Sequence, residues 1–207
     1  MASHDTRMLL LGAVALFEPV NGYQIRRELL SWQVEDWAHV NPGSIYNGLA
    51  TLTRQGHLVR HDLVDGGRPV AVYELTETGR AELERLVRAG LEEVSVVDRT
   101  AFSAAFGLVP LIPAERALRS LVVRRTALEE TVRRLATPTT PAEAPPHAVR
   151  GVVMWLDLAV AELAWLRETI ELLRRDRLRL EPWVPPAHDA GWQMDADRGR
   201  YRALLGR

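Results

Sequence analysis

The spacing of apolar residues changes at Gly56, and this change constrains the fold more than any other feature of the chain. Before Gly56, apolar residues recur at helical spacing in three segments between residues 5 and 54. After it, residues 57–63 and 69–75 have the pattern of two short strands, joined by Asp65-Gly66-Gly67, which suits a tight turn. A long amphipathic segment follows. Three helices, a hairpin and a return to helix predict a winged helix-turn-helix domain at the N-terminus.

Residues suited to helix caps predict where these helices begin and end. Asn21, Asn41 and Thr76 are expected N-caps, because short polar side chains accept hydrogen bonds from the first free backbone N–H groups. Pro42 fits the first turn of the third helix, where its missing N–H costs nothing. Gly56 is expected to end that helix.

The second half of the chain is predicted to be helical. One helix begins at Pro113, four prolines within residues 137–146 mark a loop, and a long helix follows over 147–180. We therefore expect a mainly α protein with a small β-hairpin: a winged-helix domain over 1–80, a helical dimerisation domain over 81–181 and an irregular tail over 182–207.

The long helix carries a heptad pattern, in which apolar residues step alternately by three and four positions. This pattern predicts a helix packed along a partner helix, and we expect it to form the seam of a homodimer. The alternative is that the seam packs only within its own subunit. The seam consists of Val149, Val152, Leu156, Ala159, Leu163, Leu166, Ile170 and Leu173.

A second apolar face lies beside this seam and includes Trp155 and Trp165, with Glu162 between them. Tryptophans next to a carboxylate can form a pocket for a planar or cationic small-molecule effector. Packing in the core is the favoured interpretation, because aromatic residues at helical spacing usually bury surface.

The predicted third helix has two distinct faces. Ile45, Leu49 and Leu52 form an apolar face, which should point into the core. The opposite face is polar and suits a helix in the DNA major groove, where Asn can bond adenine and Arg can bond guanine or phosphate; an ordinary solvated face is the alternative. The candidate DNA-contacting residues of this helix are Ser44, Tyr46, Asn47, Thr51 and Arg54.

Two arginines of the predicted hairpin extend this candidate surface. Arg68 lies at the tip beside two glycines, where a wing reaches phosphates or the minor groove, and Arg60 lies on the incoming strand. The charge balance argues in the other direction, because residues 1–80 contain seven arginines against nine acidic residues. DNA binding therefore has to depend on the local placement of charge.

Several other functions find no support. The chain has no cysteine and its six histidines have no zinc-binding spacing, so we expect no metal, no cofactor and no enzymatic activity. The apolar run of residues 8–17 is too short to span a bilayer. We expect a cytoplasmic protein without a membrane partner.

The N-terminal 80 or so residues resemble the PadR-type transcriptional regulators. The resemblance rests on Leu10-Leu11-Gly12, Asn21-Gly22-Tyr23-Gln24-Ile25, Pro42-Gly43-Ser44-Ile45-Tyr46, Gly67-Arg68-Pro69 and the segment from Tyr73 to Arg80. It implies a dimeric winged-helix DNA binder, usually a repressor, whose helical C-terminal part dimerises and often senses a small molecule. Double-stranded DNA with a near-palindromic operator is the expected partner. The competing hypothesis is a winged-helix module that binds another regulator and has little or no affinity for DNA.

Overall fold

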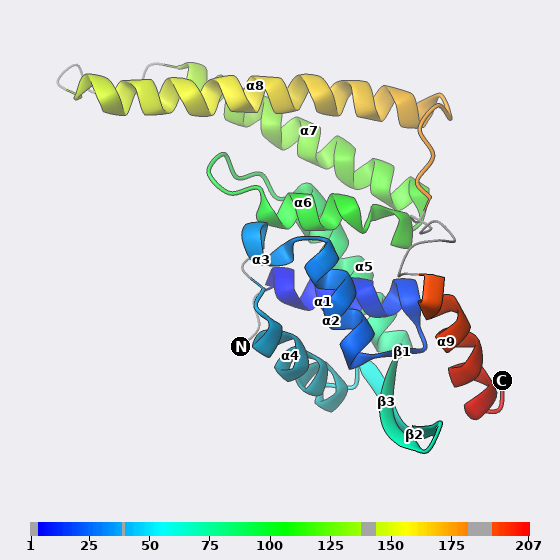
Figure 1. Cartoon of the computed structure of the whole chain (residues 1–207). Coiled ribbons are helices and arrows are strands. Elements are labelled where there is room, and N and C mark those ends of the chain that lie inside the picture. The colour runs from blue at the N-terminus through cyan, green and yellow to red at the C-terminus, as the bar shows by residue number, and fades with distance from the viewer. Residues whose placement is uncertain (1–3, 39, 138–143, 182–191) are drawn as a thin grey trace. The chain divides into compact units, whose positions relative to one another are not determined.

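The computed structural model describes residues 4–38, 40–137, 144–181 and 192–207, and the chain divides into two compact units. The winged-helix unit combines Met1–Val87 with Glu181–Arg207, and the helical unit is Arg88–Leu180. Helix α5 (Glu77–Glu92) runs across the boundary between them. Figure 1 shows the elements of each unit.

The winged-helix unit contains a small antiparallel sheet and the helices around it. Its helices are α1 (His4–Phe17), α2 (Gly22–Ser31), α3 (Val34–Trp37), α4 (Pro42–Arg54), the first part of α5, and α9 (Trp192–Leu204). Its strands are β1 (Val20–Asn21), β2 (Leu58–Asp65) and β3 (Arg68–Leu75), in the order β1-β3-β2. The β2–β3 hairpin pairs Leu58 with Leu75 and, at its tip, Asp65 with Arg68. The predicted winged helix-turn-helix order is therefore confirmed.

The three predicted N-caps are all present. The Asn21 side chain accepts a 2.8 Å hydrogen bond from the Gln24 backbone N–H, and the Gln24 side chain accepts one in return from the Asn21 N–H, forming a capping box. Asn41 accepts from the Ser44 N–H at 2.9 Å, and Thr76 accepts from the Gly79 N–H at 2.9 Å. Local chemistry thus sets the start of α2, α4 and α5.

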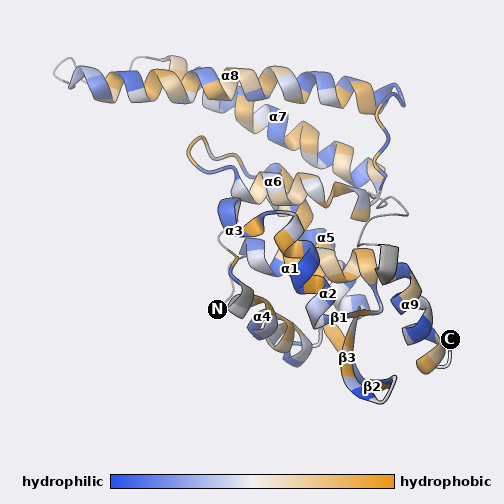
Figure 2. Ribbon diagram, viewed as in Figure 1, coloured by the Kyte–Doolittle hydropathy of each residue, from blue (hydrophilic) through white to orange (hydrophobic). Residues whose placement is uncertain are grey.

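The core of the winged-helix unit forms around α1, most of whose residues are buried. The predicted inward face of α4 is confirmed, because Ile45, Leu49 and Leu52 are all buried. In Figure 2 the hydrophobic residues of these helices alternate with hydrophilic ones, as expected for helices with one buried side. Burying one face of α4 leaves its other face directed away from the core.

Gly79, in the first turn of α5, lies directly against the backbone of His57, in the turn between α4 and β2. A methyl group at this position would lie 2.0 Å from the carbonyl oxygen of His57, which is a backbone atom with little freedom to move. We therefore expect Gly79→Ala to lower the free energy of unfolding by about 1–3 kcal/mol, measured by urea denaturation. Gly199→Ala, in open space on α9, is the matched control and should be neutral or slightly stabilising. Equal stability of the two variants would contradict the close approach of Gly79 to the His57 carbonyl oxygen.

The helical unit contains α6 (Thr100–Gly107), a single 3₁₀ turn at Val109–Leu111, α7 (Ala114–Ala136) and α8 (Pro146–Arg174). Helices α7 and α8 pack along one another. Their buried residues include Leu121 and Leu128 from α7 and Ala159 and Leu166 from α8. No helix in the described part of the chain is long and apolar enough to cross a membrane.

The structure differs from the sequence-based expectations in several elements, of which α6 was not predicted at all. The prediction of an irregular tail was wrong for residues 192–204, which form α9, because Met194 and Tyr201 are spaced to bury one helical face. The long helix α8 ends at Arg174 rather than at residue 180. A third strand, β1, pairs with β3 and was not predicted, since two residues are too few to show a periodic pattern.

Candidate nucleic-acid interface

The outer face of α4 carries the residues predicted to contact DNA. Tyr46 has 48% of its surface exposed, and Asn47 and Arg54 are also exposed. Ser44 and Thr51 are half-buried at the edges of this face. Arg54 donates a 3.2 Å hydrogen bond to the Thr51 hydroxyl, and Ser44 donates one to the Asn41 carbonyl oxygen at 2.7 Å. The structure thus brings all five predicted α4 residues onto one surface.

Two close contacts hold α4 in its orientation. A Cβ atom at Gly48 would lie 2.3 Å from Leu10 Cδ1 of α1, so the Leu10 side chain occupies the space beside this glycine and would have to move for a larger residue. A side chain at Gly22, the first residue of α2, would meet the Tyr46 ring at 3.0 Å. Glycine at both positions lets α4 pack tightly against its neighbours, and this tight packing orients the outer face.

The hairpin places its two predicted arginines in different environments. Arg68 is exposed at the tip, after Gly66 and Gly67 with φ angles of 57° and 80°. Its side chain has no hydrogen-bond or ion-pair partner among the described residues. Arg60 instead donates two hydrogen bonds to the Asp62 carboxylate, at 2.7 and 3.0 Å, and the nearby carboxylate raises the pKa of Arg60. Arg68 therefore presents an uncompensated charge at the tip, whereas the charge of Arg60 is shared with Asp62.

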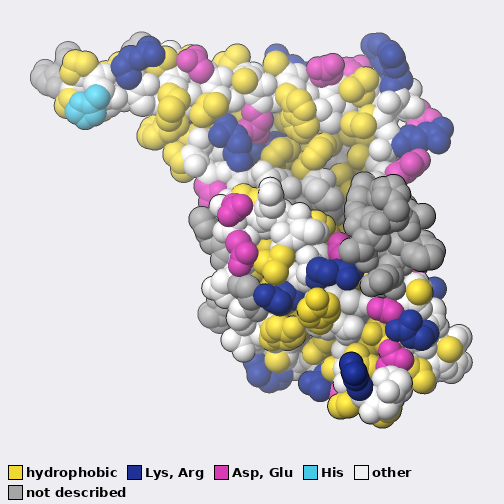
Figure 3. All heavy atoms as spheres, viewed as in Figure 1, with side chains coloured by type: hydrophobic (Ala, Val, Ile, Leu, Met, Phe, Trp, Pro, Cys, Tyr) yellow, Lys and Arg dark blue, Asp and Glu magenta, His cyan; other side chains and the backbone are white. Residues whose placement is uncertain are grey.

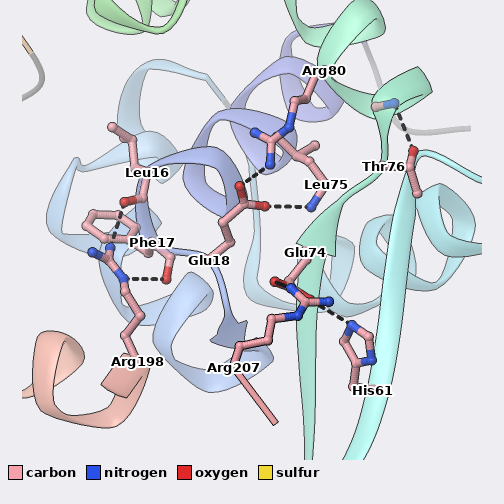
Figure 4. A network of polar contacts seen from close by, with 11 residues as sticks. Leu16, Phe17, Glu18, His61, Glu74, Leu75, Thr76, Arg80, Arg198 and Arg207 are labelled. Atoms are coloured by element: carbon pink, nitrogen blue, oxygen red, sulfur yellow. Dashed lines mark hydrogen bonds and ion pairs between the residues drawn. The ribbon is translucent and has the colours of Figure 1, made fainter. Parts of the chain in front are cut away.

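A contact surface that sequence reasoning missed lies between α9 and the rest of the winged-helix unit. The Asn21 side chain donates a 2.8 Å hydrogen bond to the Tyr201 hydroxyl, and burial raises the pKa of that tyrosine. Gln24 donates to the Asp197 carboxylate at 2.7 Å. Arg198 donates to the backbone carbonyl oxygens of Leu16 and Phe17, as Figure 4 shows. The seven-residue spacing of Met194 and Tyr201 was the one signal in the sequence that pointed to this helix.

The predicted dimer seam falls into two parts. Leu163, Leu166 and Ile170 are buried within the chain itself. Val149 is 38% exposed, whereas Val152, Leu156 and Leu173 are half-buried. Figure 3 shows hydrophobic side chains gathered along α7 and α8. The part of the seam toward the start of α8 therefore has apolar surface left for a partner, and the homodimer stays a prediction.

The three residues of the predicted effector pocket have partners within the helical unit. Glu162 accepts hydrogen bonds from Arg124 at 2.8 Å and from Arg99 at 3.0 Å. Trp165, 41% exposed, packs edge-on against the rings of Phe102 and Phe106, and Trp155 is half-buried. A cationic ligand of Glu162 would have to displace one of two arginines. The effector pocket stays a prediction.

Comparison with known proteins identifies the domain that holds α4 and the hairpin. Residues 10–85 match the model of the Transcriptional regulator PadR-like family. The segment that holds α4 and the hairpin is therefore a PadR-like domain. Among solved structures, this PadR-like chain is similar to the crystal structure of Bacillus subtilis PadR in complex with operator DNA, with 19% sequence identity and a TM-score of 0.35. The match covers 80% of the PadR-like chain and 98% of the B. subtilis chain.

No curated protein matches this PadR-like chain. The matched family is one of transcriptional regulators. It spans α4 and both strands of the hairpin, so every residue predicted to contact DNA lies within the matched segment.

Proposed function

We propose that this PadR-like regulator is a cytoplasmic, sequence-specific DNA-binding protein that represses transcription as a homodimer on a near-palindromic operator. The observation that carries the proposal is the exposed polar face of α4, which is held outward by a fully buried opposite face within a PadR-like domain. A twofold dimer presents two such helices, so the operator half-sites should lie one helical turn, or a multiple of it, apart. Modulation of operator binding by a small molecule is part of the same proposal.

Each residue of the surface has a distinct role in this proposal. Asn47 reads a base edge, because its amide can bond adenine at two positions. Arg54 and Arg68 bind phosphates, and Arg60 adds a weaker contact because Asp62 shares its charge. Ser44 lies in the first turn of α4, where backbone N–H groups and the helix dipole favour an anion. Tyr46 and Thr51 add further contacts to DNA on the same face of α4.

The proposal predicts different effects for base-reading and phosphate-binding residues. Asn47→Ala should weaken operator binding by about 1–3 kcal/mol and relax the sequence preference at one operator position. Arg54→Ala and Arg68→Ala should weaken binding to all sequences alike, and each should reduce the slope of log Kd against log salt by about one. Gel shifts with the duplex upstream of the chain's own gene, at several salt concentrations, measure both effects.

The same experiment separates this proposal from a winged-helix module that binds another protein. The acidic balance of residues 1–80 favours that alternative, because phosphate neutralisation dominates DNA affinity. A folded Asn47/Arg54/Arg68 triple alanine variant that binds the operator at full strength would exclude the α4 and hairpin surface as the site of DNA contact. Absence of any binding by the unmodified chain would favour the protein-interaction module.

A further inference from the structure

The hairpin predicted to approach DNA carries three carboxylates, which a polyanion would repel. Asp62 and Asp65 lie on β2, and Glu74 lies on β3. Asp62 is paired with Arg60 of its own strand. Asp65 lies at the tip, where its backbone partner in the hairpin is Arg68. An unpaired carboxylate at this position would oppose the contact that Arg68 is expected to make.

The C-terminal segment, formed by α9 and the three residues after it, supplies an arginine to each of the other two carboxylates. Arg200 Nη2 lies 3.3 Å from Asp65 Oδ2, and it also pairs with Asp197 on its own helix. Arg207 Nη1 lies 2.8 Å from Glu74 Oε1, and the second oxygen of Glu74 hydrogen bonds to His61 at 2.8 Å, as Figure 4 shows. Both arginines therefore reach the hairpin from the opposite end of the sequence.

These arginines are held in place because α9 is docked rather than free. Tyr201 and Met194 are buried, Asp197 accepts from Gln24, and Arg198 donates to two carbonyl oxygens at the end of α1. Arg200 lies about 100° around the helix from Tyr201, so docking Tyr201 turns Arg200 sideways toward the hairpin. The hydrogen bonds to Asp65 and Asp197 raise the pKa of Arg200, so its charge is permanent.

The segment that contains α9 is more basic than the N-terminal segment that contains the hairpin. Residues 192–207 carry four arginines and two aspartates, whereas residues 1–80 carry seven arginines and nine acidic residues. The excess of two positive charges in the first segment equals the excess of two negative charges in the second. The local placement of charge that DNA binding requires is thus partly supplied by a segment outside the winged-helix domain expected over 1–80.

We propose that α9 and the residues after it form a positioning element for DNA binding. In this element Arg200 neutralises Asp65 so that the tip of the hairpin can approach phosphates, and Arg207, beyond the end of α9, neutralises Glu74 further along β3. This inference rests on the proposed function. Arg200 acts through Asp65, so it is expected to matter only while position 65 carries a negative charge. A merely structural role, or a direct contact of Arg200 with phosphate, would not depend on the charge of Asp65.

The test is a double-mutant cycle on the full-length chain, with operator affinity measured by gel shift against the duplex upstream of its own gene. Arg200→Ala should weaken binding roughly tenfold, because it leaves a bare carboxylate beside the phosphates. Asp65→Asn alone should bind as well as the unmodified chain or more tightly. The Asp65→Asn/Arg200→Ala double variant should return to within about twofold of the unmodified affinity, since the repulsion is gone.

A matched control separates this effect from a general loss of positive charge. Arg202 is exposed on the same helix and has no partner among the described residues, so Arg202→Ala removes one charge without touching the hairpin. Its affinity should stay close to that of the unmodified chain. Thermal unfolding by circular dichroism checks that every variant is folded.

Three results would overturn the inference: unchanged affinity of Arg200→Ala, a double variant as weak as Arg200→Ala, or an equal loss in Arg202→Ala. The affinity of Asn47→Ala, measured in parallel, distinguishes failure of this inference about α9 from failure of the proposed DNA-binding function. If Asn47→Ala weakens binding but the double variant shows no recovery, only the role of α9 is wrong. If the unmodified chain does not bind the duplex, both proposals fail.

Discussion

Replacing Glu162 by alanine is expected to lower the free energy of unfolding of the helical unit by about 3–5 kcal/mol. The reason is Arg124, whose side chain is only 1% exposed. Its guanidinium donates to Glu162 at 2.8 Å and to the backbone carbonyl of Glu93, and it stacks on Phe102 with 3.9 Å from Cζ to the ring centroid. Without Glu162 this buried positive charge keeps neutral partners only. Urea unfolding followed by circular dichroism measures the loss.

A second variant shows whether the missing counter-charge causes the loss. Removing both charges, in Arg124→Met/Glu162→Leu, should recover most of the stability, because well-packed apolar side chains replace buried ion pairs at little cost. Glu162→Gln keeps an acceptor for Arg124 and should fall between Glu162→Ala and the unmodified chain. A Glu162→Ala variant as stable as the unmodified chain would show that Arg124 does not need this carboxylate.

The second large effect concerns the proposed homodimer. Val149→Glu/Leu156→Glu should convert the dimer into a folded monomer and lower operator affinity roughly a hundredfold or more, although no DNA-contacting residue changes. Glutamates that face each other across a twofold seam repel one another, and removing their charges from water costs a large free energy of desolvation. A monomer binds one half-site at a time and loses the gain from linking two binding events, which is about 10²–10⁴ in affinity. Sedimentation and gel shifts measure the two quantities.

The choice of positions follows from their exposure. Leu163 is only 7% exposed within the single chain, so a glutamate there would unfold the helical unit whether or not a dimer forms. Val149 and Leu156 are partly exposed and allow the distinction. Leu158→Glu is the matched control, since Leu158 is exposed on the opposite side of α8 from Leu156. If Leu158→Glu is a monomer and Val149→Glu/Leu156→Glu is still a dimer, the interface lies on the other face of α8.

The parts of the fold that were predicted correctly are those that neighbouring residues determine. Asn21, Asn41 and Thr76 cap helices through hydrogen bonds to residues three positions ahead, and the hairpin follows from two glycines at positive φ. The docking of α9 was not predicted, because Asn21 and Tyr201 are 180 positions apart in the chain. Nothing near either residue indicates the other.

The candidate site divides in the same way. The outer face of α4 follows from helical periodicity once Ile45, Leu49 and Leu52 are assigned to the core. The pairing of Arg60 with Asp62 was missed, although residues two apart on a strand lie on the same face and the pair was therefore predictable. The engagement of Glu162 by Arg99 and Arg124 depends on the packing of separate helices, which no local pattern in the sequence encodes.

The assembly of one domain from both ends of the sequence has a consequence for biosynthesis. A ribosome makes residues 1–87 before the whole helical unit and only afterwards makes α9. Until then Asn21, Gln24 and Glu74 lack their partners Tyr201, Asp197 and Arg207. The winged-helix unit is thus completed only after the helical unit has been translated. Prematurely terminated chains that contain α4 and the hairpin are therefore expected to compete poorly with full-length protein for the same promoter.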